Sequence, residues 1–365
     1  MVIDSYKLQG KLLCKAGCTY VVYRKGTLLL YRDLEKRPIS KIKVPMSRMQ
    51  KALSQFRYVE RTLRLEPRIA TDISENEIIF SYKGKIYNAD LNSLELQIEH
   101  CFRSGMNNPL SFCTYIDAKG IKHVLYGEYW PNTSRSEVSI FERDSNEWRK
   151  VYSFPPGRIK HIHQIVYEKN ENVLWIATGD SDSESGIWKA DIRFNNVIPY
   201  YTGKQQYRTC FIVPDKKKLV YATDSPIEKN AILTIDNGYI HNIYNMPGPC
   251  IFGRRLNNKY SILATSVECD PSETWIGGIL HNTLAKGVHD RYCHLIVYCN
   301  DSGKCFEICR YKKDWISIVF LFGNIMFPEI EDDKYVYFTG QALEKIDGCT
   351  LRINISDLNE VEKCH

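Results

Sequence analysis

The 365-residue sequence has no long apolar run, no regular cysteine framework and no basic tract. No stretch approaches the roughly 18 apolar residues of a membrane-spanning helix. The segment after Met1 has no basic start followed by an apolar core, so we predict neither a membrane span nor a secretion signal. The thirteen cysteines are odd in number and irregularly spaced, which is typical of reduced, buried thiols. We therefore expect a cytoplasmic protein.

The charge excludes some partner classes and leaves others open. The net charge is only +6, and Lys and Arg are dispersed along the chain, which argues against a nucleic-acid partner. An anionic small molecule or a sugar polymer fits such a surface. The 24 tyrosines and six tryptophans serve β-sheet cores, and aromatic rings also provide platforms for sugars. The oligomeric state does not follow from the sequence.

One unit recurs along the chain: an apolar strand, a tight polar turn, a second apolar strand and a small or polar break. Six copies lie at 74–82, 117–128, 168–180, 214–225, 256–266 and 331–340, and a shorter seventh at 18–32. Their β-branched and aromatic strands and their period favour four-stranded propeller blades. We predict an all-β, seven-bladed β-propeller, with six blades possible, in one domain over 1–365. The expected blades are 10–44, 68–100, 110–152, 160–201, 207–245, 249–309 and 313–358.

Two segments depart from the repeat. Residues 46–60 read as one short, basic, amphipathic helix inserted between blades, and residues 268–290 form a long loop inside the sixth blade. A long loop on a closed scaffold is a candidate functional segment, and the alternative is that it has no functional role.

The blade topology selects the candidate site residues. In a propeller blade, the loop that enters the first strand and the loop that leaves the second lie on the same face. We expect side chains from these loops to surround one central pocket. The entering positions are Arg68, Arg158, His161, His163, Tyr207 and Arg208, and the leaving positions are Glu128, Tyr129, Asp180, Asp182 and Asp224.

His161 and His163 stand two residues apart at the start of a strand, so their side chains lie on the same side of it. An acid–base or substrate-binding role is the preferred interpretation. A structural role stays open, and so does a metal pair, which would need a third ligand from another blade. We predict no cofactor and assign no metal ligand, although a divalent metal remains possible.

Two loops add carboxylates and aromatic rings. Glu128, Tyr129 and Trp130 together suit a polar ring substrate, although Trp130 could instead pack on the next blade. The loop with Asp180, Asp182 and Glu184 has only part of a calcium-loop pattern, and a solvated turn is the plainer interpretation.

Three arginines from different predicted blades, Arg68, Arg158 and Arg208, would complement an acidic ligand. The guanidinium fork pairs with a carboxylate through two hydrogen bonds, as in the recognition of a uronic or sialic acid. Salt bridges between blades are the alternative role.

At GDSDSESGIW and in the repeated strand pairs, the sequence resembles the sialidase-like propellers with Asp-box turns. It keeps the glycine and tryptophan of the box at Gly186 and Trp188, while the aspartate is displaced and the threonine is missing. The resemblance implies an arginine triad, a Tyr–Glu nucleophile pair and an acidic proton donor. The matching candidates are Arg68, Arg158, Arg208, Tyr129, Glu128 and Asp180.

The chain is also similar to seven-bladed polysaccharide lyases and to glycosidases of bacterial surface-polysaccharide gene clusters. That similarity implies Arg or His against a uronate carboxylate, and His or Tyr removing the C5 proton. We expect a carbohydrate-active propeller that acts on an acidic saccharide by β-elimination or hydrolysis. The alternative is a propeller that only binds a glycan or a protein. The expected catalytic residues are His161, His163, Tyr129 and Glu128, and the expected substrate-binding residues are Arg68, Arg158, Arg208, Tyr207, Asp180, Asp224 and Trp130.

Overall fold

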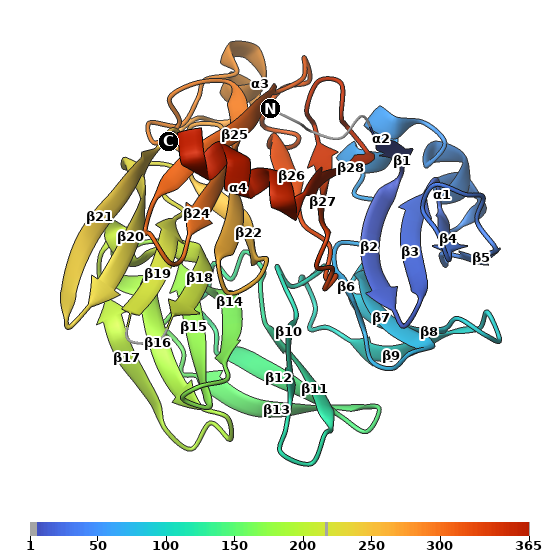
Figure 1. Cartoon of the computed structure of the whole chain (residues 1–365), viewed down its shortest axis with the longest axis horizontal. Coiled ribbons are helices and arrows are strands. Elements are labelled where there is room, and N and C mark those ends of the chain that lie inside the picture. The colour runs from blue at the N-terminus through green and yellow to red at the C-terminus, as the bar shows by residue number, and fades with distance from the viewer. Residues whose placement is uncertain (1–5, 216–217, 365) are drawn as a thin grey trace. The chain divides into compact units, whose positions relative to one another are not determined.

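A computed structural model describes residues 6–215 and 218–364 (Figure 1). The strands form seven four-stranded sheets, and the described strand pairs within them are antiparallel. In six sheets the strand order follows the chain. These are β2–β5 (Lys11–Ala16, Thr19–Arg24, Thr27–Tyr31, Ser40–Lys43), β6–β9 (Ala70–Asp72, Glu77–Tyr82, Lys85–Asp90, Leu96–Cys101), β10–β13 (Cys113–Ile116, Lys122–Gly127, Val138–Asp144, Glu147–Phe154), β14–β17 (His161–Glu168, Val173–Gly179, Gly186–Asp191, Val197–Thr202), β18–β21 (Thr209–Asp215, Lys218–Thr223, Asn230–Asp236, Tyr239–Met246) and β22–β25 (Cys250–Arg255, Tyr260–Thr265, Tyr292–Cys299, Cys305–Lys312).

The seventh sheet joins the two ends of the chain. Its order is β1-β28-β27-β26, with bounds Lys7–Gln9 for β1, Asn324–Met326 for β26, Tyr335–Gln341 for β27 and Cys349–Asn354 for β28. Lys7 pairs with Leu351, and Gln9 pairs with Cys349. Seven consecutive four-stranded sheets, the last built from both termini, make the fold a seven-bladed β-propeller, and that prediction is confirmed.

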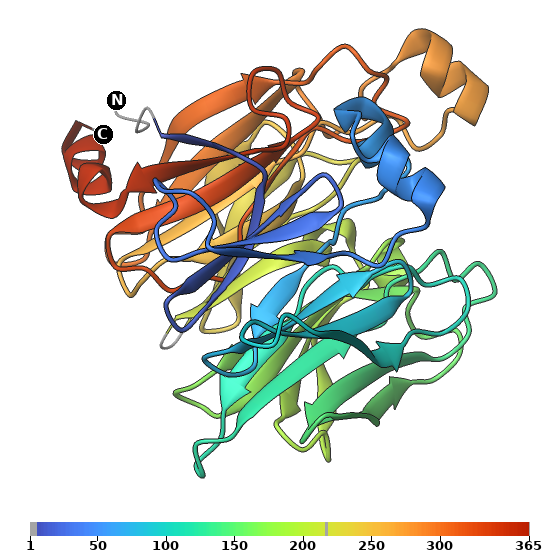
Figure 2. The same ribbon diagram turned by 90° about the vertical axis from the view of Figure 1, so that its right-hand side faces the viewer.

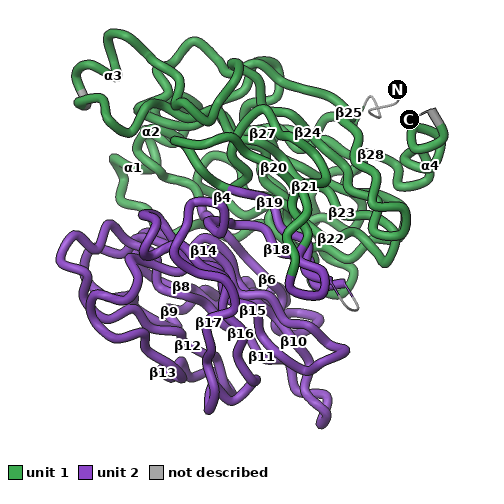
Figure 3. Tube along the Cα trace, turned by 90° about the vertical axis from the view of Figure 1, so that its left-hand side faces the viewer, with its two compact units in different colours: residues 1–66, 224–234, 239–365 green, residues 67–223, 235–238 purple. Residues whose placement is uncertain are grey.

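The chain divides into two compact units (Figure 3). Unit 1 contains residues 1–66, 224–234 and 239–365, and unit 2 contains residues 67–223 and 235–238. The sheets β6–β9, β10–β13 and β14–β17 lie in unit 2, and the sheets β2–β5, β22–β25 and β1/β26–β28 lie in unit 1. The single domain and its blade limits stay predictions.

Burial explains why the second strand of the repeat is so apolar. In β15, with the sequence VLWIATG, all residues after Val173 are buried, because neighbouring strands flank it and both of its faces are covered. The last strand of the same sheet, β17, contains no buried residue: half of its residues are exposed and half are partly buried. Such outer strands tolerate polar and proline residues, as at Pro199. The feature that recurs in each copy of the repeat is therefore its inner hairpin.

The insertion predicted as one helix over 46–60 is two helices, α1 (Arg48–Leu53) and α2 (Arg57–Thr62). Ser47 caps α1 through a capping box with Gln50. The chain turns at Ser54, whose hydroxyl donates to the carbonyl of Lys51 and so competes with continued helix. The other helices are α3 (Trp275–His281), inside the long loop, and α4 (Ile355–Cys364). Among the described residues, no helix combines the length and apolarity that crossing a membrane requires.

Candidate functional site

Two buried histidines enter the site from the first strand of the β14–β17 sheet. His161 pairs with Gly179 on β15, and the register of the two strands shifts between Ile162 and Gln164, at His163. The two ring centroids are 5.0 Å apart. The two imidazoles therefore lie side by side in the structure.

Backbone carbonyls determine the tautomer of each imidazole. Nδ1 of His161 lies 3.1 Å from the carbonyl oxygen of Trp130, and Nδ1 of His163 lies 3.0 Å from that of Thr209. A carbonyl oxygen can only accept a hydrogen bond, so both Nδ1 atoms carry the proton. In a neutral ring, Nε2 is then left with a lone pair.

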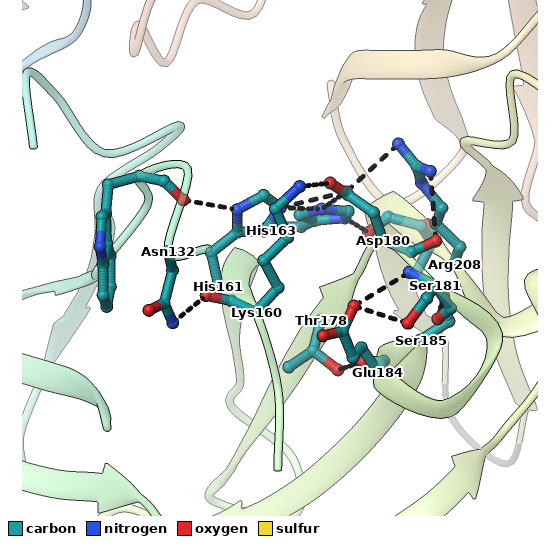
Figure 4. A network of polar contacts seen from close by, with 12 residues as sticks. Asn132, Lys160, His161, His163, Thr178, Asp180, Ser181, Glu184, Ser185 and Arg208 are labelled. Atoms are coloured by element: carbon teal, nitrogen blue, oxygen red, sulfur yellow. Dashed lines mark hydrogen bonds and ion pairs between the residues drawn. The ribbon is translucent and has the colours of Figure 1, made fainter. Parts of the chain in front are cut away.

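These lone pairs converge on one carboxylate (Figure 4). The two Nε2 atoms are 3.0 Å apart, and they lie 3.1 Å (His161) and 3.2 Å (His163) from Oδ1 of Asp180. Three electron-rich atoms at such distances repel one another unless a positive charge lies among them. The group His161, His163 and Asp180, called the His–Asp cluster below, is therefore built to hold a shared proton or a cation.

Asp180 is fixed in place by two cations and an amide. Its Oδ2 lies 2.6 Å from Nζ of Lys160, and its Oδ1 lies 3.3 Å from Nη2 of Arg208. Its backbone carbonyl accepts hydrogen bonds from Gln205 and Arg208. Burial alone would raise the pKa of Asp180, but a proton shared with Nε2 of His161 and His163, together with the charge of Arg208, lowers that pKa well below its usual range. Asp180 is ionised.

Burial has the opposite consequence for His161. Removal from water lowers the pKa of His161, and the neighbouring His163 lowers it further, while Asp180 partly opposes both. The imidazole is held neutral near pH 7. The Asp180 side chain retains 28% of its exposure and the His161 side chain 4%, so solvent reaches the cluster from the Asp180 side.

Gly179 makes room for the ring of His163 to pack closely against strand β15. A Cβ atom added to Gly179 would lie 2.3 Å from Cε1 of His163, far inside van der Waals contact. The glycine before Asp180 is thus required by the packing of the His163 ring against β15. Gly179 belongs to the small or polar break that ends the second strand of each repeat, and here that break also makes room for the His163 ring.

The loop after β11 covers the cluster from the neighbouring sheet. The Tyr129 ring packs on His161 with centroids 4.2 Å apart, and Trp130 supplies the carbonyl described above. Glu128 is buried instead in an ion pair with Arg103 and accepts a hydrogen bond from the Ser139 amide at 2.7 Å. Burial raises the pKa of Glu128, and these two partners oppose that rise. Tyr129 contacts the cluster, and Glu128 fastens the loop.

The remaining sequence candidates lie in different surroundings. Arg208 contacts Asp180, whereas the exposed Arg158 stacks over the Trp188 ring at 4.8 Å. Arg68 lies before β6, where its amide donates to the Ser81 carbonyl. Tyr207 is buried, with its ring 5.4 Å from that of Tyr201. Asp224 is buried directly after β19.

The glycine-flanked loop that follows Asp180 is a capped turn. Asp182 begins a single 3₁₀ turn that ends at Glu184. The Glu184 carboxylate accepts hydrogen bonds from Ser181 and forms an ion pair with Arg135. These contacts give Glu184 a structural task in the loop that holds Asp180.

Sequence reasoning missed Lys160, Gln205 and Arg103. Lys160 directly precedes His161, yet the sequence drew attention to Arg158, two residues earlier, as the cation. Arg103 stacks over the Trp130 ring at 4.4 Å, besides its contact with Glu128. The adjacency of Lys160 to the histidine pair was the available signal.

The His–Asp cluster also has the composition of a metal site. One ligand atom from each of His161, His163 and Asp180 lies within 4.8 Å of the others. Imidazole nitrogen and carboxylate oxygen together suit zinc, manganese or iron. The fixed tautomers fit this role, because both Nε2 lone pairs are directed to the same place. The residues therefore fit a divalent cation as well as a proton.

Comparison with known proteins supports the fold. No protein-family model matches the chain, and no curated protein matches it in sequence. Two similar solved structures are oligogalacturonate lyases: one in complex with manganese (TM-score 0.57, 12% identity, 95% of this chain and 89% of that chain), and one from Vibrio parahaemolyticus (TM-score 0.55, 11% identity, 96% and 92%). A chain of a mitotic checkpoint complex is comparably similar, with a TM-score of 0.56 at 7% identity over 97% of each chain.

At such identities, the likeness shows a shared propeller fold, and that fold carries different functions. The more specific likeness to Asp-box sialidases stays a prediction. The function has to be argued from the site itself.

Proposed function

We propose that this protein acts on an acidic oligosaccharide by β-elimination at the His–Asp cluster. The observation that carries the proposal is the convergence of two imidazole Nε2 atoms on the ionised Asp180, between the cations Lys160 and Arg208.

The charge of the site suits an acidic sugar. Lys160 and Arg208 bring two positive charges against the single carboxylate of Asp180. A proton or a cation held by the histidines would add to that surplus. A uronate carboxylate entering from the Asp180 side would be attracted by the positive charges of Lys160 and Arg208.

The His–Asp cluster is suited to accept a proton. Elimination removes the proton at C5 of the uronate, forms the C4=C5 double bond and breaks the C4–O bond, and the leaving oxygen then takes a proton. A proton delivered to one Nε2 is shared with the second Nε2 and with Asp180, which relieves their repulsion. Tyr129, packed on His161, is the proposed donor to the leaving oxygen.

Hydrolysis is less well supported by the same contacts. It requires one protonated carboxyl group as acid and a second carboxylate as base or nucleophile. Asp180 is held ionised by its four partners, and Glu128 is engaged by Arg103 and Ser139. Neither carboxyl group is placed to exchange protons with a sugar, so elimination is favoured.

A divalent cation would be held by Nε2 of His161, Nε2 of His163 and a carboxylate oxygen of Asp180. Its positive charge would stabilise the negative charge that develops on the uronate when the C5 proton leaves. With the histidines engaged by the cation, Tyr129 would act as the base only as its phenolate, which would take the C5 proton and return it to the leaving oxygen.

The test offers the purified protein a panel of uronate and sialate oligosaccharides, with added Mn²⁺ or with chelator. Elimination is followed by the short-ultraviolet absorbance of the unsaturated product. We expect turnover of at least one uronate, reduced by about 10²- to 10⁴-fold in His161→Gln. The matched control is His294→Gln in unit 1, a buried histidine bonded to Asp290 and Glu307, which should keep full activity.

The outcomes separate the alternatives. No turnover of any uronate contradicts the proposal. Binding of a glycan without turnover, lost in His161→Gln and kept in His294→Gln, identifies a non-catalytic glycan-binding propeller. Activity that disappears with chelator and returns with Mn²⁺ assigns the cation to the cluster, and activity indifferent to both assigns the shared proton.

A further inference from the structure

Three inserted segments come together on unit 1. They are α1 and α2, the helix α3, and the loop over residues 313–322 that precedes β26. The rings of Tyr58 and Trp315 make an edge contact with centroids 5.7 Å apart, and the hydroxyl of Ser317 donates to the Gly278 carbonyl. Figures 2 and 3 show α1, α2 and α3 along one edge of unit 1.

This edge concentrates exposed apolar side chains. The described residues include sixteen large apolar side chains that are exposed, and seven of them lie on or beside these short segments: Met49, Phe56, Tyr58, Leu63, Ile276, Leu280 and Trp315. We call these seven residues the apolar edge. Trp315 retains 78% of its exposure and Leu280 retains 74%. Isolated apolar residues are normal on a surface, whereas a cluster of this kind marks an interaction surface.

The apolar edge borders an open groove. The groove has a volume of about 470 Å³ and is lined by side chains that include Ile279, Trp315 and Phe320. Its polar neighbour Asn282 already accepts a hydrogen bond from the Ile318 amide at 2.9 Å. The groove is therefore apolar in character and suits a hydrocarbon chain.

The exposed charges on α1 and α2 and directly after α2 are basic, whereas the partly exposed Asp270 and Glu273 precede α3. On α1, Arg48 and Lys51 are exposed, and Arg64 is exposed directly after α2. Glu60 is the acidic residue between Met46 and Arg64, and it is buried against Tyr23 and Arg57. An approaching surface thus meets apolar tips beside uncompensated positive charge on these two helices.

We propose that the apolar edge docks on an anionic lipid bilayer surface. Trp, Tyr and Leu side chains beside Lys and Arg are the composition that binds at the boundary between headgroups and acyl chains. Each cation near an anionic surface adds about 1 kcal/mol of attraction, equivalent to about a fivefold gain in affinity. A second copy of the chain would instead bring Arg48, Lys51 and Arg64 against the same residues, which repel.

The experiment is sedimentation of the full chain with phosphatidylcholine vesicles, with and without phosphatidylserine. We expect the protein to pellet with the anionic vesicles, and less so as salt is raised. Trp315→Ser and Leu280→Ser should each weaken that binding about tenfold, since each removes one apolar side chain from the bilayer. Arg48→Ser combined with Lys51→Ser should weaken binding to anionic vesicles specifically.

The matched controls are Tyr239→Ser on β21, which is 71% exposed, and Lys41→Ser on β5. Both should bind as the unmodified chain does. Failure to pellet with anionic vesicles overturns the proposal, and so does equal loss in the controls. Sedimentation velocity without lipid tests for self-association. If the chain forms a dimer that Trp315→Ser dissociates, the apolar edge binds a second copy of the chain, and docking on lipid is contradicted.

Discussion

Replacing Gly179 by alanine is predicted to disrupt the site through one steric contact. The backbone of Gly179 is not left-handed, so alanine is conformationally acceptable there. The added Cβ would lie 2.3 Å from Cε1 and 2.8 Å from Nε2 of His163, where carbon contacts are normally about 3.5–4.0 Å. The ring would therefore have to move by about 1 Å or more.

The ring of His163 has little room to move. Its side chain is buried, and Nδ1 is bound to the Thr209 carbonyl at 3.0 Å. Overpacking of this kind costs about 1–3 kcal/mol of unfolding free energy. Displacement also carries Nε2 away from His161 and Asp180, so the variant should lose activity together with stability.

A double-mutant cycle tests this reasoning. Urea denaturation gives the unfolding free energy of the unmodified chain, Gly179→Ala, His163→Ala and the double variant. Removing the ring removes the clash, so the double variant should be more stable than the sum of the single losses predicts, by about 1–3 kcal/mol. Single losses that add to within about 0.5 kcal/mol would refute the contact.

Three further predictions test other contacts. Arg61 is fully buried in ion pairs with Asp314 and Asp347. Arg61→Leu should therefore lower the unfolding free energy, measured by urea denaturation, by about 3–5 kcal/mol. A loss below about 1 kcal/mol would contradict the importance of these ion pairs. Burial lowers the pKa of His161 in the folded chain. As the pH falls below about 6.5, His161 is therefore protonated in the unfolded chain before it is protonated in the folded chain, and the unfolding free energy falls by at most about 1.4 kcal/mol per pH unit. That part of the slope should disappear in His161→Gln, as followed by denaturation between pH 7.5 and 5.5. Asp180→Asn should abolish turnover and, in calorimetry with Mn²⁺, any binding of the cation, whereas unchanged turnover would remove Asp180 from the site.

The fold was largely predictable because its determinants are local and repeated. An inner strand covered on both faces must be apolar along its whole length, and a tight turn must be polar, so each sheet repeats the same signal. The insertion at 46–60 was predicted less well. Its amphipathic pattern favoured one helix, but the side chain of Ser54 bonds to the backbone and divides it in two.

The site was only partly predictable. The rule that entering and leaving loops share a face selected His161, His163, Tyr129 and Asp180, and the structure places these side chains together. The rule says nothing about which cation accompanies them. Arg158 and Lys160 are both basic and two residues apart, and the difference arises because Arg158 can stack over Trp188, a residue 30 positions away in sequence.

The orientation of the two imidazoles in the His–Asp cluster depends on backbone groups, which no sequence motif reveals. Two backbone carbonyls, from Trp130 and Thr209, direct both Nε2 lone pairs toward Asp180. Every residue has a carbonyl, so substitution at either position leaves the tautomers as they are unless the loop itself moves. Variants of the Arg103–Glu128 ion pair, which fastens the Tyr129 loop, should therefore impair the cluster indirectly, whereas a change of the Trp130 ring alone should alter packing before it alters proton transfer.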